Sequence, residues 1–419
     1  MKILVIGGGG REHAIVRKLK ESPRTTELYC APGNGGISRD AECVPIDIND
    51  AAGVVKFAKE EQIDLVFVAP DNPLATGMVD ELKKSGIRAF GPEAKAAEIE
   101  SSKVFSKNLM NKYNIPTAGY EVFDNPQEVL GHISSRGKYP AVIKADGLAL
   151  GKGVMIAENY NEAEAAVKTI MEDKKFGDSG NRVVVEDFLT GPEVSVLAFT
   201  DGKCVKPMVS AKDHKRALDG GKGLNTGGMG TISPNPYYTP EIAETCMKTI
   251  FAPTVKAMNT EGRKFKGCLY FGLMITPDGP KVIEYNSRFG DPETQVVLPL
   301  LKTDFVDIIE AVIDEKLEQQ PIEWSKGACA CVVMASGGYP LKYKKGMEIT
   351  GLDKNGQLPG VTVYHAGTVL KNRKFYTDGG RVLGVTAVGG NLDEAIKKAY
   401  EGAGKIHFDG AFYRHDIGR

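Results

Sequence analysis

Two polar residues in the last third of the chain have the spacing of a metal site. Glu284 and Asn286 lie two residues apart in a stretch that reads as a β-strand, so their side chains point to the same face of the sheet. A carboxylate and an amide oxygen on one face suit Mg²⁺, which prefers oxygen ligands and retains several waters. A hydrogen-bonded polar pair facing solvent is the alternative. Because Arg288, Asp291 and Glu293 follow at once, the pattern favours the metal.

A glycine-rich segment with the sequence KADGLALGKG begins at Lys144 and lies between two expected strands. Only three residues separate Gly147 from Gly151, and Gly153 stands where a Walker A loop needs Ser or Thr, so the segment is not a loop of that kind. A hairpin tip with backbone amides, Lys144 and Lys152 would still cover a triphosphate. The alternative is a solvated hairpin with incidental lysines, which the neighbouring motifs make weak.

Two carboxylates, Glu186 and Glu193, lie seven residues apart, at the end of one expected strand and the start of the next. One would accept a hydrogen bond from an adenine amino group and the other from ribose hydroxyls. Acidic residues beside turns are usually only solvated, so this pair alone is weak evidence for a nucleotide.

Four consecutive glycines, Gly7–Gly10, follow the first expected strand and precede a helix, where dinucleotide-binding folds carry G-x-G-x-x-G. Counted from Gly7 or from Gly8, the third glycine position holds another residue, so the fingerprint fails. The backbone amides of a helix N-terminus still suit an anion, and Arg11 lies in the first turn. We interpret the loop as a phosphate site, with a tight packing turn as the alternative. The loop Pro32–Gly36 is expected at the same sheet edge.

Composition excludes several classes of protein. Lys and Arg total 53 against 54 Asp and Glu, so no net charge favours nucleic acid or an anionic membrane as a partner. No apolar run reaches the about 18 residues of a membrane span. The seven cysteines are scattered without a C-x-x-C pair and the six histidines lie far apart, which favours a cytoplasmic protein with reduced thiols and no zinc.

Residues 1–101 alternate short apolar runs with helical patterns, which predicts a parallel sheet covered by helices on both faces. The expected strands are 2–6, 27–31, 63–69 and 87–90, and the expected helices are 11–20, 50–60 and 73–85.

Residues 102–316 combine β-hairpins with helices, and residues 317–419 read as a smaller α+β domain. The chain is therefore predicted to be a multidomain protein of the α/β and α+β classes. The further expected strands are 139–144, 153–157, 182–186, 193–200, 268–276 and 281–286, and the further helices are 102–113, 161–172, 240–260 and 392–402.

Together these motifs resemble the ATP-grasp superfamily, whose members clamp ATP between two subdomains and activate a carboxylate as an acyl phosphate. Within it, the chain resembles the phosphoribosylamine–glycine ligase family from Met1 to the closing YRHDIG at 413–418. The motifs that carry this narrower resemblance are GGGGREHA at 7–14, KDHKR at 212–216, GGKGLNTGGMG at 220–230 and RFGDPETQ at 288–295, and the last is the most specific.

The resemblance implies a pre-ATP-grasp domain over 1–101, an ATP-grasp fold over 102–316 with a mobile lid at about 117–192, and a C-terminal domain over 317–419. It also implies that Mg²⁺ or Mn²⁺ binds Glu284 and Asn286. ATP would contact Lys103, Lys144, Gly147, Gly151, Lys152, Gly153, Glu186, Asp187, Phe188, Leu189 and Glu193. The strand before the metal pair, Leu269–Met274, has no carboxylate for a further ligand.

The implied reaction joins glycine to 5-phosphoribosylamine through glycyl phosphate, giving glycinamide ribonucleotide, ADP and phosphate in purine biosynthesis, in a protein expected to be a monomer. Lys144 and Arg288 would screen the charge between glycine and ATP. The hypothesis places the sugar phosphate at Gly9, Gly10, Arg11 and Asn34, and the glycine and amine site at Asp213, Arg288 and Asp291.

Three alternatives stay open at this point. Another ATP-grasp ligase or a carboxylase would share the ATP residues, and a carboxylase would use bicarbonate. A nicotinamide oxidoreductase would rest on the first glycine loop alone. A silent nucleotide sensor would bind ATP without turnover, against which Glu284, Asn286 and Arg288 argue.

Overall fold

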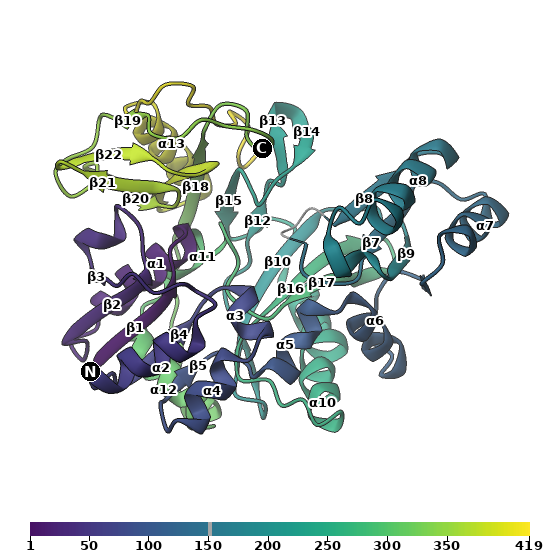
Figure 1. The fold of residues 1–419 in the computed structure, drawn as a ribbon, viewed down its shortest axis with the longest axis horizontal. Coiled ribbons are helices and arrows are strands. Elements are labelled where there is room, and N and C mark those ends of the chain that lie inside the picture. Colours follow the sequence, from purple (N-terminus) through teal and green to yellow (C-terminus); the bar gives the residue numbers. More distant parts are fainter. Residues whose placement is uncertain (150–152) are drawn as a thin grey trace.

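The computed structural model describes residues 1–149 and 153–419, so the predicted ATP contacts Gly151 and Lys152 lie outside the described residues (Figure 1). Among the described residues, no helix has the length and apolar character needed to cross a membrane.

A five-stranded, all-parallel sheet with the order β3-β2-β1-β4-β5 forms the centre of the N-terminal part. Ile3 and Val5 on the central strand pack into one apolar core, whereas Leu4 and Ile6 pack into another, so both faces are covered as predicted. The strands are β1 Lys2–Gly7, β2 Glu27–Pro32, β3 Glu42–Cys43, β4 Leu65–Val68 and β5 Ala89–Phe90, and the helices are α1 Gly10–Lys20, α2 Ala51–Glu60, α3 Asp71–Ala75, α4 Met78–Lys84 and α5 Ala94–Ser101.

The expected helix 73–85 is wrong as a single element, because Gly77 interrupts it. Gly77 has a φ of +89°, a left-handed conformation that glycine adopts without steric cost and that cannot continue an α-helix. The chain therefore ends α3 at Ala75 and begins α4 at Met78.

Two four-stranded sheets face each other across the central part of the chain, on the right of Figure 1. The outer sheet, β6-β9-β7-β8, carries α7 and α8 on its far side, and the inner sheet, β11-β10-β16-β17, is covered by α6, α9 and α10. The outer elements are β6 Tyr120–Phe123, α7 Pro126–Arg136, β7 Ala141–Ala145, β8 Val154–Ala157, α8 Tyr160–Val167 and β9 Val183–Asp187. The inner ones are α6 Lys103–Lys112, β10 Glu193–Thr200, β11 Val205–Pro207, α9 Pro240–Cys246, α10 Ala252–Thr260, β16 Gly267–Thr276 and β17 Gly279–Asn286.

Both predicted hairpins are confirmed: β7 pairs antiparallel with β8, and β16 with β17. The expected helix 240–260 contains a π-helical turn at Met247–Phe251 between α9 and α10.

A last five-stranded sheet, β12-β15-β18-β23-β20, crosses the predicted boundary at residue 316. The strands β12 Lys212–Asp213 and β15 Gly230–Ser233 come from the central part, whereas β18 Ala328–Ala335, β20 Thr362–His365 and β23 Arg381–Gly389 come from the C-terminal part. The remaining elements are β13 Arg216–Leu218, β14 Lys222–Asn225, α11 Thr294–Val297, α12 Phe305–Ile313, β19 Glu348–Ile349, β21 Thr368–Lys371, β22 Lys374–Thr377 and α13 Leu392–Ala403. The two domain boundaries stay predictions.

Candidate active site

A β-bulge lies in β17 just before the predicted metal pair, Glu284 and Asn286, and it contacts Lys144 of β7. Gly272 of β16 pairs with Glu284 but Leu273 pairs with Val282, so Ile283 is the extra residue. A bulged residue leaves the hydrogen-bond ladder, and the Ile283 carbonyl instead accepts a hydrogen bond from Lys144 Nζ at 3.0 Å. The bulge thereby ties the lid strand β7 to the strand that carries Glu284.

Lysines surround the Glu284 carboxylate. Lys215 Nζ lies 3.4 Å from Glu284 Oε1 and 3.3 Å from Glu193 Oε2. Burial alone would raise the pKa of Glu284, but the charges of Lys215, Lys144 and Lys103 lower it to about 2. Glu284 is therefore ionised at any physiological pH, which is the state a metal ligand needs.

The donors at this position fit a hard cation that takes most of its ligands from elsewhere. The Asn286 amide donates to the Tyr285 carbonyl at 2.7 Å, which leaves its oxygen as the acceptor. A side chain at Gly272 would start 3.1 Å from Glu284 Cγ, so an acid at this position of β16 would crowd the Glu284 side chain. No cluster of three His, Cys, Asp or Glu with metal-binding geometry occurs among the described residues. One carboxylate and one amide, completed by phosphate oxygens and water, suit Mg²⁺.

A buried ion network stands behind the predicted phosphate contacts. Glu186 forms two ion pairs: its Oε1 lies 2.8 Å from Lys144 Nζ, and its Oε2 lies 2.9 Å from Lys107 Nζ. Lys103 donates to the Gly147 carbonyl at 2.8 Å and so touches the glycine segment itself. Lys107 was not predicted, although its place one turn after Lys103 on α6 is a signal for a shared face. Burial lowers the pKa of Lys107 to about 8.

The predicted base and ribose contacts lie around the end of β9. Glu186 is buried, whereas Phe188 is exposed and Asp187 is held by an ion pair with Arg136. Glu193 begins β10 on the exposed side of the strand. The adenine role of Glu186 stays a prediction, since both of its oxygens already face lysines.

Arg288 is held by Glu100, a carboxylate that no sequence motif singles out. Its Nη2 lies 3.0 Å from Glu100 Oε1, and the other oxygen of Glu100 accepts from the backbone amide and the hydroxyl of Ser287, both at 2.8 Å. The buried Arg288 Nε has no hydrogen-bond partner among the described residues. The charge of this guanidinium is therefore only partly matched by hydrogen-bond acceptors of the protein.

The first glycine loop lies directly against the RFGDPETQ motif. A side chain at Gly10 would start 2.7 Å from Gln295 Nε2, and one at Gly9 would start 3.5 Å from Asp291 Oδ2. Gln295 in turn donates to Asp291 Oδ1 at 2.8 Å. The predicted phosphate loop and the predicted amine site are therefore neighbours.

Internal partners already engage part of the predicted sugar-phosphate site. The Gly9 amide donates to Glu12 Oε2 at 2.6 Å, and Arg11 contacts Glu12 and the Phe289 carbonyl. Asn34 donates to the carbonyls of Gly8 and His365 at 2.9 and 2.8 Å. Asn34 therefore braces this loop against the C-terminal part, and its contact with substrate stays a prediction.

Acidic side chains gather where β10, β12 and β16 meet. Glu293 Oε1 accepts from Ser195 Oγ and Tyr270 Oη, each at 3.1 Å. Burial and the charge of Glu293 raise the pKa of Asp213 well above its ordinary value. A buried acid whose pKa is raised beside a second carboxylate is a candidate functional group.

We expect Asp213→Asn to stabilise the fold at neutral pH while lowering turnover. Because the folded-state pKa of Asp213 is raised, its contribution to the free energy of unfolding is full below the unfolded pKa of about 3.9 and is lost as pH rises. Asparagine removes that loss. Thermal unfolding at pH 4 and pH 7 should show a larger gain for the variant at pH 7, and an equal gain at both values would contradict the raised pKa.

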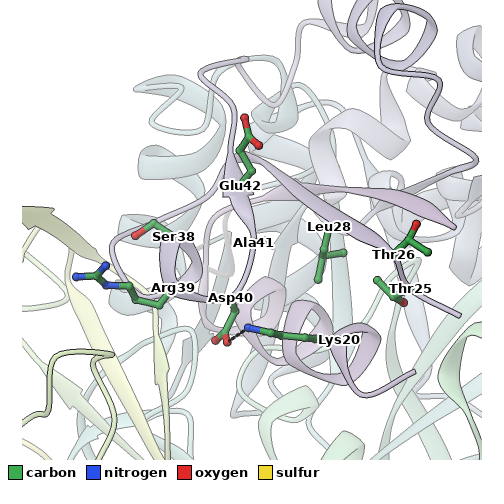
Figure 2. Close-up of a pocket in the computed structure, with 9 residues that line it drawn as sticks. All are labelled: Lys20, Thr25, Thr26, Leu28, Ser38, Arg39, Asp40, Ala41 and Glu42. Atoms are coloured by element: carbon green, nitrogen blue, oxygen red, sulfur yellow. Dashed lines mark hydrogen bonds and ion pairs between the residues drawn. The ribbon is translucent and has the colours of Figure 1, made fainter. Parts of the chain in front are cut away.

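A separate hollow opens beside α1 and β2, with a volume of about 460 Å³. Figure 2 shows Lys20 and Asp40 paired across it, at 2.9 Å. Its lining residues are Lys20, Thr25, Thr26, Leu28, Ser38, Arg39, Asp40, Ala41 and Glu42, none of which belongs to the predicted site.

Comparison with known proteins agrees with this geometry. Phosphoribosylglycinamide synthetase domains match along the chain: the N domain over 1–100, the ATP-grasp (A) domain over 101–294 and the C domain over 329–419. A phosphoribosylamine–glycine ligase from Clostridium acetobutylicum is 49% identical over 419 residues, covering 100% of both chains. The trifunctional purine biosynthetic protein adenosine-3 of Gallus gallus is 48% identical over 420 residues, which span 100% of this chain and 42% of that protein.

Solved structures extend the similarity. The crystal structure of a Thermotoga maritima phosphoribosylamine–glycine ligase has a TM-score of 0.87 at 34% identity, with 100% of both chains covered. The biotin carboxylase domain of a Hydrogenobacter thermophilus 2-oxoglutarate carboxylase, solved with MgADP, shares the fold alone: its TM-score is 0.75 at 16% identity, covering 98% of this chain and 91% of that one.

The facing sheets, the buried lysines and the carboxylate–amide pair define an ATP-grasp ligase. More narrowly, the chain belongs to the phosphoribosylglycinamide synthetase family, the phosphoribosylamine–glycine ligases. The predicted fold class and family are thereby confirmed, and the nicotinamide oxidoreductase is set aside. The residue roles and the mobility of the lid stay predictions.

Proposed function

We propose that the chain joins the carboxylate of glycine to the amine of 5-phosphoribosylamine and releases glycinamide ribonucleotide, ADP and phosphate for purine biosynthesis. The observation that supports this most strongly is a set of lysines around Glu284 at the end of β17. The charges of Lys103, Lys144 and Lys215 all lower the pKa of Glu284, which lies two residues before Asn286. Such a cluster suits a polyanion and a metal together.

ATP would lie between the two facing sheets, with its phosphates at Lys103 and Lys144 and its base beside Glu186. The residues present fit a metal, and Mg²⁺ or Mn²⁺ held by Glu284 and Asn286 would neutralise charge on the phosphates. Catalysis of phosphoryl transfer rests mainly on such positioning and charge stabilisation.

In the first step, a carboxylate oxygen of glycine attacks the γ-phosphorus and the bond to ADP breaks. Arg288 would hold the glycine carboxylate through its guanidinium charge, which offsets the repulsion between the glycine carboxylate and the anionic phosphates of ATP. The product, glycyl phosphate, reacts readily with water, so closure of the lid over it would protect it.

In the second step, the amine of phosphoribosylamine attacks the carbonyl carbon, loses a proton and expels phosphate. Asp213 and Asp291 would flank the amine. Gly9, Gly10 and Arg11 would receive the sugar phosphate, and Gly9 and Gly10 lie beside Asp291. We further propose that the protein acts as a monomer in the cytoplasm, where its seven free cysteines stay reduced.

Phosphate release from ATP tests this function. We expect release only when glycine and phosphoribosylamine are both present, with no stimulation by bicarbonate, and we expect mass spectrometry to detect glycinamide ribonucleotide. Stimulation by bicarbonate without glycine would instead indicate a carboxylase, and ATP binding without turnover for any acceptor would indicate a nucleotide sensor.

A further inference from the structure

A partly buried arginine of the C-terminal part reaches into the candidate active site. Arg381 begins β23, and its Nη1 donates to the carbonyls of Gly227 and Asp291 at 2.8 and 2.9 Å. Its Nη2 lies 3.2 Å from the Asp291 carboxylate. One guanidinium therefore binds both the backbone and the side chain of Asp291 and, at the same time, a turn from another segment.

The C-terminal part holds the Gly227–Gly228 turn from two directions. While Arg381 binds the Gly227 carbonyl, the Gly227 amide donates to the hydroxyl of Tyr339 at 3.1 Å. Both polar backbone groups of Gly227 are thus bound by side chains more than a hundred residues away. These hydrogen bonds from the C-terminal part support the position of the turn.

The turn has no spare room on either side. A side chain at Gly227 would start 2.9 Å from the Arg381 guanidinium carbon. Gly228 has a φ of +116°, and a side chain there would start 2.6 Å from Asp213 Oδ1 and 2.4 Å from a ring carbon of Pro292. The turn is therefore packed against Arg381 on one side and against Asp213 and Pro292 on the other.

The charge of Arg381 also acts on Asp291. Burial by itself would raise the pKa of the Asp291 carboxyl, but Arg381 lowers it, and Arg11 and Gln295 add to this effect. Asp291 is therefore held as a carboxylate, pointing toward Gly9 at the sugar-phosphate loop.

We propose that Arg381 is a positioning residue for the second step: it holds Asp291 and the Gly227–Gly228 turn in the geometry that receives the amine of phosphoribosylamine. This inference rests on the proposed role of Asp291. Three segments then build the amine site: Asp291, the Gly227–Gly228 turn and Arg381. In this proposal the C-terminal part is needed for the reaction, although Arg381 itself does not touch the substrate.

Kinetics of Arg381→Lys test the proposal. Lysine keeps the positive charge but loses the planar fork that contacts three groups at once. We expect the KM for phosphoribosylamine to rise, or kcat to fall at saturating phosphoribosylamine, by about 10–100-fold, since a displacement of about 1 Å can cost that much. The KM for ATP should stay within about twofold, because the ATP contacts lie on other elements. Tyr339→Phe should move the same parameter less.

Arg414→Lys is the matched control. Arg414 is a C-terminal arginine, more deeply buried than Arg381, that likewise binds a carboxylate, Asp416, and a carbonyl of the central part, that of Arg216. It lies at the outer β13 strand, away from the candidate active site. We expect both lysine variants to lower the melting temperature similarly and only Arg381→Lys to impair phosphoribosylamine use.

The outcomes separate the possible failures. An equal rise in the KM values for ATP, glycine and phosphoribosylamine in Arg381→Lys would overturn the proposal, as would a loss confined to the melting temperature. Asp291→Asn tests the underlying role: an impaired Asp291→Asn with a normal Arg381→Lys would refute Arg381 alone, whereas a normal Asp291→Asn would refute the amine site. Should Arg381→Lys not fold, unchanged phosphoribosylamine kinetics in Tyr339→Phe would count against the inference.

Discussion

Replacing Glu284 by glutamine should lower kcat by about 1,000-fold or more, equivalent to about 4 kcal/mol at 1.4 kcal/mol per tenfold. Glutamine keeps the size of the side chain but removes the negative charge with which Glu284 is proposed to bind the metal ion. The fold should persist, because Lys215 retains Glu193 as a partner at 3.3 Å. Steady-state rates at increasing Mg²⁺ and Mn²⁺ concentration provide the measurement, and the variant should need more metal for half-maximal rate.

Asp278→Asn supplies the control for Glu284→Gln. Asp278 lies in the turn of the same β16–β17 hairpin, its side chain is 82% exposed, and it forms an ion pair with Lys281 at 3.4 Å. It should keep the parent rate and metal dependence. If Glu284→Gln retained more than about a tenth of the parent kcat, the loss would be below about 1.4 kcal/mol, too little for a metal ligand.

Local patterns were enough to predict the hairpin that carries the site. Alternating apolar residues over 268–276 and 281–286, with Pro277, Asp278 and Gly279 between them, indicated two strands and a turn, and β16 and β17 form there. The bulge at Ile283 could not be predicted in this way, because it depends on how two strands pair. Yet the bulge is what turns a carbonyl toward Lys144.

Partners that lie far apart in the chain could not be predicted from the sequence. Glu100 looks like any acidic residue near a helix end, and only the folded chain brings it to Arg288 and Ser287. Arg381 lies 90 residues from Asp291 and carries no local signal. Lys107 is different: its spacing of four from Lys103 places both on one helix face, so helical periodicity would have found it. The residues predicted to touch ligand follow short motifs, whereas the partners Glu100 and Arg381, which hold them in place, do not.

Lys144→Met should reduce kcat/KM for ATP by about 1,000-fold, a loss of about 4 kcal/mol. Lys144 is the one described residue whose ammonium group contacts both the β9 carboxylate Glu186, at 2.8 Å, and the bulge carbonyl of Ile283, at 3.0 Å. It therefore joins the lid sheet to the sheet with the metal pair. Methionine keeps the buried chain length, and Glu186 keeps Lys107, so folding should survive with a lower melting temperature.

The pattern of losses in Lys144→Met distinguishes a phosphate contact from a structural brace. If Lys144 contacts the ATP phosphates, its loss should strongly reduce kcat/KM for ATP. The KM values for glycine and phosphoribosylamine should then change little, because other residues are proposed to bind those substrates. If Lys144 instead only braces the two sheets, its loss should impair the use of ATP, glycine and phosphoribosylamine alike. Lys138→Met, at an exposed position on the same lid, should change none of them. Unaltered ATP dependence in Lys144→Met would leave the phosphates without their central cation, and the position proposed for ATP between the sheets would have to be abandoned.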